Sequence, residues 1–143
     1  VKGGERVLDI GTGSGILAIA ALKLGAAKAE GVDIDPMCVR TAGENAALNG
    51  VQNDLTVLVG DLSEKATGVY DVICANIVAN AIIHLVPDVP ALLAKHGTFL
   101  ASGIIDTRKD EVIAAVQAAG LALREVKEKN GWVALVCGHT GRE

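Results

Sequence analysis

Short apolar runs recur along the chain and predict a series of strands. The first run, Arg6–Ile10, shows no alternation of apolar and polar residues, which is typical of a parallel strand buried on both faces. Four further runs are bounded by glycine or by polar residues and predict strands over Ala29–Val32, Leu55–Val59, Tyr70–Ala75 and Thr98–Ser102.

Longer segments between these runs predict helices, and the alternation of strand and helix indicates an α/β fold. The predicted helices cover Gly15–Leu24, 36 to about 48, Ala79–Lys95 and Arg108–Ala119. Asp35 followed by Pro36 marks a helix start, with Asp as N-cap and Pro at the first helical position. Pro87 and Pro90 predict a kink, or two pieces, in the third helix. Residues 62–69 are too few and too polar to predict a full crossover helix.

The end of the chain predicts a β-hairpin. Leu121–Lys129 and Trp132–Gly138 flank Asn130-Gly131, a dipeptide favoured in tight hairpin turns. Right-handed crossovers between the earlier strands predict a doubly wound sheet with ligands at its carboxyl edge. The predicted fold is therefore one Rossmann-like α/β domain over residues 1–143. Its seven-stranded sheet is mostly parallel, and the C-terminal hairpin adds one antiparallel strand.

Composition narrows the possible roles. The formal net charge is -4 and no run of Lys or Arg occurs, which argues against a dedicated nucleic-acid surface. The three cysteines are odd in number and far apart, as expected of free thiols in a reducing cytoplasm. No signal peptide and no apolar span of membrane-crossing length is recognisable, so we expect no membrane partner. Because the chain begins at Val1, close to the first predicted strand, we expect it to be a fragment of a longer chain.

The turn after the first strand is rich in glycine. Gly11, Gly13 and Gly15 follow the pattern G-x-G-x-G, between a strand and a helix, where we expect backbone amides to point at a ligand. The dinucleotide fingerprint has a small residue at the sixth position, for helix packing, and Ile16 stands there instead. No Gly-Lys-Ser/Thr follows, so the turn is not a phosphate-binding P-loop either. A plain tight turn is the alternative interpretation.

Acidic residues follow the second and third strands. Asp33 lies about 20 residues past the glycine turn, a spacing that suits hydrogen bonds to ribose hydroxyls. Asp61 follows the third strand, where it can accept from an adenine amino group, with Leu62 or Ile34 against the ring. The alternative for both aspartates is a solvated loop residue.

Asn76 ends the fourth strand, beside the glycine turn, where a reacting group would sit. Its amide oxygen can accept a hydrogen bond from a substrate amine. A helix N-cap is the alternative role. His84, His96 and His139 form no pair with metal-ligand spacing, so we expect no metal site.

The order VLDIGTGSG, GVDIDP, GDL and DVICANI resembles the motif set of class I methyltransferases. More narrowly, GSGILAIAALKLGAAKAEGVDIDP, ANIVAN and the closing tryptophan hairpin resemble the ribosomal protein L11 methyltransferase family over essentially the whole chain. The fourth-strand motif departs from the family's usual Asn-Ile-Leu-Ala at one aliphatic position, Val78.

This resemblance implies S-adenosylmethionine as the cofactor and the amines of a large-subunit ribosomal protein, on lysine side chains and the N-terminus, as methyl acceptors. The resemblance implies that Gly11, Asp33 and Asn76 bind the cofactor, and Asn76 is the predicted catalytic residue. The full set of predicted cofactor residues is Asp9, Gly11, Thr12, Gly13, Gly15, Asp33, Ile34, Asp61, Leu62 and Asn76. Asp9 is expected to order the glycine loop. Family members also carry an N-terminal recognition domain and a helix before the first strand, and we expect neither within these 143 residues. Another acceptor, namely a different protein, RNA or a small molecule, stays open, as does a cofactor-binding module without activity.

Overall fold

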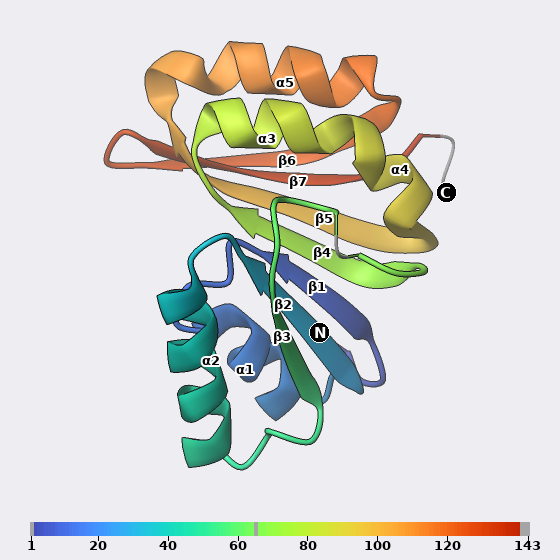
Figure 1. Ribbon diagram of the computed structural model, residues 1–143. Helices are drawn as coiled ribbons and strands as arrows, with labels where there is room; N and C mark the ends of the chain where they lie inside the picture. Colours follow the sequence, from blue (N-terminus) through green and yellow to red (C-terminus); the bar gives the residue numbers. More distant parts are fainter. Residues whose placement is uncertain (1, 65, 141–143) are drawn as a thin grey trace.

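The computed structural model of the protein describes residues 2–64 and 66–140 (Figure 1). Within these residues, seven strands form one sheet in the order β3-β2-β1-β4-β5-β7-β6. All neighbouring strands pair in parallel except β7, which runs antiparallel to both β5 and β6. The predicted doubly wound sheet with one antiparallel strand is thereby confirmed. The strands are β1 (Arg6–Ile10), β2 (Lys28–Asp33), β3 (Leu55–Val59), β4 (Tyr70–Asn76), β5 (Leu93–Ile105), β6 (Leu121–Lys129) and β7 (Trp132–His139).

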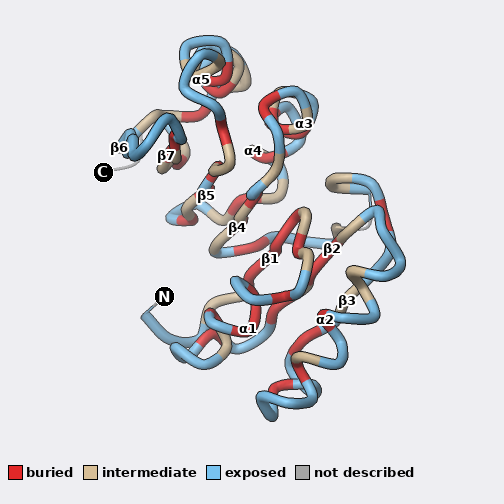
Figure 2. Tube along the Cα trace, turned by 90° about the vertical axis from the view of Figure 1, so that its left-hand side faces the viewer, coloured by how far each residue is buried: buried red, intermediate tan, exposed pale blue. Residues whose placement is uncertain are grey.

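Helices cover both faces of this sheet. On one face lie α1 (Ile16–Lys23) and α2 (Pro36–Leu48), and on the other lie α3 (Ala79–Leu85), α4 (Val89–Leu92) and α5 (Lys109–Ala118) (Figures 1 and 2). Single 3-10 turns, Val86–Asp88 and Asp106–Arg108, precede α4 and α5.

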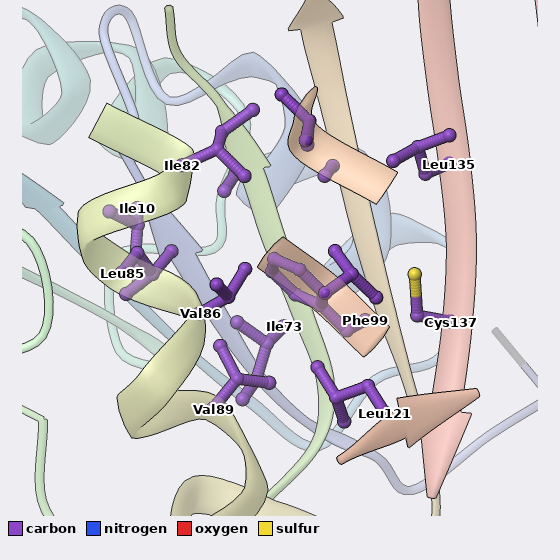
Figure 3. Packing of buried hydrophobic residues seen from close by; sticks show 14 of the residues in the cluster. Ile10, Ile73, Ile82, Leu85, Val86, Val89, Phe99, Leu121, Leu135 and Cys137 are labelled. Carbon is purple, nitrogen blue, oxygen red and sulfur yellow. The ribbon is translucent and has the colours of Figure 1, made fainter. Parts of the chain in front are cut away.

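Two apolar clusters hold these layers together. Ile73 of β4 and Phe99 of β5 pack against α3 and α5 in the larger cluster, together with Cys137 of β7 (Figure 3). The smaller cluster joins α1 and α2 to β1, β2 and β3. In β1, Leu8 belongs to the larger cluster and Val7 to the smaller one, because successive side chains of a strand point to opposite faces. Strand β1 is therefore buried on both sides and provides a fixed base for the loop that follows it.

Local signals in the sequence set the ends of several elements. Asp35 Oδ1 accepts a hydrogen bond from the Met37 amide at 2.9 Å, which confirms the predicted N-cap of α2. The hairpin turns at Asn130 and Gly131, whose φ angles of 53° and 83° suit the predicted tight turn. No helix forms in the described part of residues 60–69, as expected.

The predicted helix 79–95 is interrupted as expected but ends earlier. A 3-10 turn separates α3 from α4 at the prolines, and the helix stops at Leu92. Leu93 already belongs to β5, where it pairs with Tyr70 of β4. Strand β5 also continues beyond the predicted Ser102, through an irregularity in its pairing with β7 between Ala101 and Ile104. Pairing with β4 lengthens β5 at its start, and pairing with β7 lengthens it at its end. Such pairing cannot be predicted from local strand propensity.

Candidate functional site

A cavity lies at the carboxyl edge of the sheet, where the strand order reverses between β1 and β4. This reversal is the place where doubly wound sheets bind ligands. The cavity measures about 410 Å³, which is within the range of small-molecule sites. Its walls come from the ends of four strands and the first turns of α3: Ile10, Gly11, Asp33, Ile34, Asp61, Leu62, Asn76, Ile77, Val78 and Ala81.

The cavity brings together most residues that the sequence singled out. Gly11, Asp33, Ile34, Asp61, Leu62 and Asn76 line it, whereas Asp9, Thr12, Gly13 and Gly15 do not. Sequence reasoning missed Ile10, Ile77, Val78 and Ala81 as wall residues. Ile77 and Val78 follow Asn76 in the same motif, so they could have been predicted to line the cavity. No feature of the sequence indicated Ala81.

The glycine loop uses its amides within the protein. The amides of Gly11 and Thr12 donate to the Val32 carbonyl at 2.8 and 3.0 Å, and the Gly15 amide donates to the Thr12 carbonyl at 2.8 Å. The Gly13 amide donates to Asp33 Oδ2 at 2.9 Å. The expectation that the loop's amides point at a ligand is therefore wrong for these four, because β2 and the loop itself already accept their hydrogens.

The glycines of the loop make room for other parts of the protein. A Cβ on Gly11 would lie 2.5 Å from Ile77 Cγ2, and one on Gly15 would lie 3.0 Å from the Cβ of Ala42 in α2. Both glycines have positive φ angles, of 72° and 84°. Gly15 accordingly lets α2 approach the start of α1, which explains this glycine without a ligand.

Asp33 joins the loop to the second helix at the cavity wall. Its Oδ2 accepts from Gly13, and its Oδ1 accepts from the Asp35 amide at 3.0 Å. Each carboxylate oxygen has two acceptor sites. Asp33 can therefore hold this backbone in place and still accept hydrogen bonds from hydroxyl groups in the cavity.

Asp9 lies behind the loop and is almost completely buried, with 1% of its surface exposed. The Thr12 hydroxyl donates to its Oδ2 at 2.8 Å, whereas Oδ1 has no hydrogen-bond partner among the residues that the structure describes. Burial raises the pKa of Asp9 to about 6, because a carboxylate loses its hydration there. The Thr12 hydroxyl and the Ala18 amide oppose this rise, and the negative charge of Asp33 adds to it.

Leu62 and Ile34 form apolar walls next to the carboxylates of Asp33 and Asp61. Leu62 has a φ of 48°, which is uncommon for a residue with a branched side chain and occurs preferentially at ligand sites. Ile34 is 69% exposed, so an aromatic ring placed over it would remove a large apolar surface from water.

Asn76 is the last residue of β4 and pairs with Ser102 of β5. The structure excludes the N-cap alternative, because Val78 occupies the N-cap position of α3, and no side chain in the described part of the chain caps that helix. Asn76 thus lines the cavity without a role at the helix start. Nowhere in residues 2–64 and 66–140 do three or more His, Cys, Asp or Glu side chains gather as a metal would require.

The family model described as "Ribosomal protein L11 methyltransferase (PrmA)" matches residues 1–140. The chain belongs to the ribosomal protein L11 methyltransferase family. The match runs from β1 to β7, so the cavity, the glycine loop and the closing hairpin all lie inside the L11 methyltransferase domain.

Individual relatives agree with this assignment. The chain is 45% identical over 137 residues to the ribosomal protein L11 methyltransferase of Desulforamulus reducens, covering 96% of this chain and 44% of that protein. The enzyme of the same name from Symbiobacterium thermophilum is 48% identical over 136 residues, covering 95% and 44%. The crystal structure of a ribosomal protein L11 methylase from Lactobacillus delbrueckii subsp. bulgaricus superposes with a TM-score of 0.92 at 34% identity, covering 95% and 70%. The chain thus spans less than half the length of the curated relatives that it matches.

Proposed function

We propose that this chain is the S-adenosylmethionine-binding core of a methyltransferase that modifies amines of ribosomal protein L11. The proposed acceptor groups are lysine side chains and the N-terminal amine. Relatives that carry this name support the substrate, and the charge of the cavity supports the cofactor. The observation that carries the proposal is a cavity at the β1–β4 switch point that presents carboxylates and, among its described walls, no Lys or Arg.

The charge of the walls discriminates between cofactors. A dinucleotide brings a pyrophosphate, which needs amide donors or cationic side chains. The loop amides of Gly11, Thr12 and Gly13 are already bound, and Asp33 and Asp61 are acidic. S-adenosylmethionine carries instead a sulfonium, an ammonium and one carboxylate, so it brings a net positive charge, which acidic walls attract, and no pyrophosphate. The buried carboxyl of Asp9, just behind the loop, adds negative charge on the same side when it is ionised.

Each wall residue then has a distinct role. Asp33 would accept from the ribose hydroxyls, Asp61 would accept from the adenine amino group, and Ile34 and Leu62 would cover the adenine ring. Gly11 would let the methionine part approach the end of β1. When bound, S-adenosylmethionine supplies an activated methyl group on its sulfonium, so the protein needs no covalent intermediate.

The remaining task of the protein is to orient the acceptor. Asn76 Oδ1 would accept a hydrogen bond from the amine and turn its lone pair toward the cavity. A free lysine amine has a pKa near 10.4, and a site that excludes water lowers this pKa and favours the neutral, nucleophilic form. Orientation of two reactants can lower a barrier by roughly 7–11 kcal/mol. Asn76 is therefore the catalytic residue in this proposal.

Calorimetric titration with S-adenosylmethionine, and with NAD as the control, tests the cofactor. We expect saturable binding of the methyl donor and none of NAD. Asp33→Ala removes a charged acceptor, which should weaken binding by about 10- to 100-fold. Asp35→Ala removes the same charge two residues away, outside the cavity, and should leave affinity nearly unchanged. Equal losses in the two variants would contradict the ribose assignment.

Transfer of labelled methyl groups to purified ribosomal protein L11 tests the acceptor. Labelled lysine and N-terminal amine positions in L11 would support the proposal. Binding of S-adenosylmethionine without transfer to L11 would favour the cofactor-binding module. Transfer to another protein, to RNA or to a small molecule, but not to L11, would favour a different acceptor.

The three free cysteines suit the reducing cytoplasm, where ribosomal proteins are made, and we infer that location.

A further inference from the structure

The catalytic asparagine of the proposed function lies against an irregularity in the next strand. Asn76 pairs with Ser102, and the residue after Ser102 is Gly103. At this point the register between β5 and β7 shifts, between Ala101 and Ile104. Such bulges re-aim side chains and are over-represented next to active sites.

Gly103 leaves the space that the Asn76 amide occupies. A Cβ on Gly103 would lie 2.6 Å from Asn76 Oδ1, a distance that real Cβ atoms essentially never show. It would also lie 3.3 Å from the Ile77 carbonyl oxygen. The φ of Gly103 is +78°, a conformation that side chains of L-residues rarely adopt. Both the backbone conformation and the space therefore require glycine. The atom that occupies this space is Asn76 Oδ1, which is proposed to accept a hydrogen bond from the substrate amine.

We propose that Gly103 is a positioning residue that sets the Asn76 side-chain oxygen for methyl transfer. The inference rests on the proposed function, because Asn76 is catalytic only if an amine is methylated. The bulge brings the Cα of Gly103 up to the amide, and the missing side chain lets Oδ1 lie there. With a methyl group at this position, Oδ1 has to retreat by about 0.8 Å to reach ordinary contact at 3.4 Å. A displacement near 1 Å in a reacting group can lower a rate by about 100-fold.

The variant Gly103→Ala tests this role, with Gly50→Ala as the matched control. Gly50 has a nearly equal φ of +72°, but a Cβ there would meet nothing within 4 Å. The two substitutions thus share the backbone strain and differ in the contact with Asn76. We expect kcat for L11 methylation to fall about 100-fold in Gly103→Ala, with a KM for S-adenosylmethionine within a few-fold of wild type. Gly50→Ala should keep both values. Equal kcat in the two variants would overturn the inference.

A second measurement is independent of activity. In a double-mutant cycle with Asn76→Ala, the loss in urea midpoint from Gly103→Ala should shrink, because the clashing amide is gone. The loss from Gly50→Ala should stay the same in both backgrounds. The side-chain amide resonances of Asn76 should also shift in Gly103→Ala and not in Gly50→Ala. Additive losses together with unshifted resonances would show that Gly103 does not act on Asn76.

These readouts separate failure of the inference from failure of the proposed function. If wild type transfers no methyl group but the cycle shows coupling, Gly103 positions the Asn76 amide and the proposed reaction is wrong. If Gly103→Ala fails to fold, its combination with Asn76→Ala decides. Recovery of folding in the double variant would support the contact, and a double variant that is equally unfolded would refute it.

Discussion

The buried carboxyl of Asp9 makes a sharp prediction about how stability depends on pH. The variant Asp9→Asn keeps the shape of the side chain and removes its titration. In wild type, burial raises the pKa of Asp9 from 3.8 to about 6. The folded state therefore binds more protons than the unfolded chain between these values, and the free energy of unfolding falls as pH rises through this window.

The size of this effect follows from the difference in pKa. Each unit corresponds to 1.36 kcal/mol, so ionising Asp9 costs the folded state about 3 kcal/mol. The asparagine variant carries no such loss. In the variant, either Nδ2 or the amide oxygen takes the position of Oδ1, which has no hydrogen-bond partner among the described residues. A buried polar group without a partner costs about 1–3 kcal/mol at every pH. The absolute stability of the variant can therefore lie on either side of wild type, whereas its pH dependence isolates the titration.

Urea denaturation of both proteins at several pH values is the appropriate assay. The difference in unfolding free energy, variant minus wild type, should grow by about 3 kcal/mol between about pH 3 and about pH 7, most steeply between about pH 4 and about pH 6, and stay constant above. Carbon NMR of the Asp9 carboxyl gives the pKa directly. A constant difference across this window, or a carboxyl that titrates near 4, would refute the argument from burial.

Two further substitutions test the internal contacts. Tyr70→Phe keeps the buried ring but removes the hydroxyl that donates to Glu30, so it should cost about 1.5–3 kcal/mol of unfolding free energy by urea denaturation. The same change in a Glu30→Gln background should cost less, and equal costs would show that the two groups are not coupled. Gly31→Ala places a Cβ 2.8 Å from Oγ1 of the buried Thr12 and should cost about 1–3 kcal/mol in the same assay. A Gly31→Ala protein as stable as wild type would show that Thr12 can move aside.

Much of the fold was predictable because its signals are local. The apolar runs placed β1 to β4, and Asp35-Pro36 fixed the start of α2. The hairpin followed from Asn130-Gly131, since few residues accept positive φ at both positions. Pairing was not predictable in the same way. The sequence around Leu93 predicts a helix, but Leu93 pairs with Tyr70 of β4 and therefore belongs to β5.

The site was predictable in its residues and not in its contacts. Parallel strands end at one edge, so Asp33, Asp61 and Asn76 had to approach one another, and all three line the cavity. Gly103 lies just beyond the predicted end of the fifth strand at Ser102, so no bulge was expected there, although an isolated glycine within a strand does suggest one. Its contact with Asn76 depends on the twist and register of β5 relative to β4, which the sequence does not encode locally.

The size of Ile16 is not what distinguishes this glycine loop from a dinucleotide-binding loop. The residue after Gly15 should be small in a dinucleotide site, because it packs against the sheet. Ile16 occupies that position but is 70% exposed, so its size obstructs nothing. The close approach of helices falls instead to Gly15, which faces Ala42 of α2. What disfavours a pyrophosphate is the internal use of the loop amides, above all the bond from Gly13 to Asp33. In the proposed function, selectivity for a cationic ligand therefore depends on the hydrogen-bond partner of the loop, the acidic Asp33 on the neighbouring strand, and not on the spacing of the glycines.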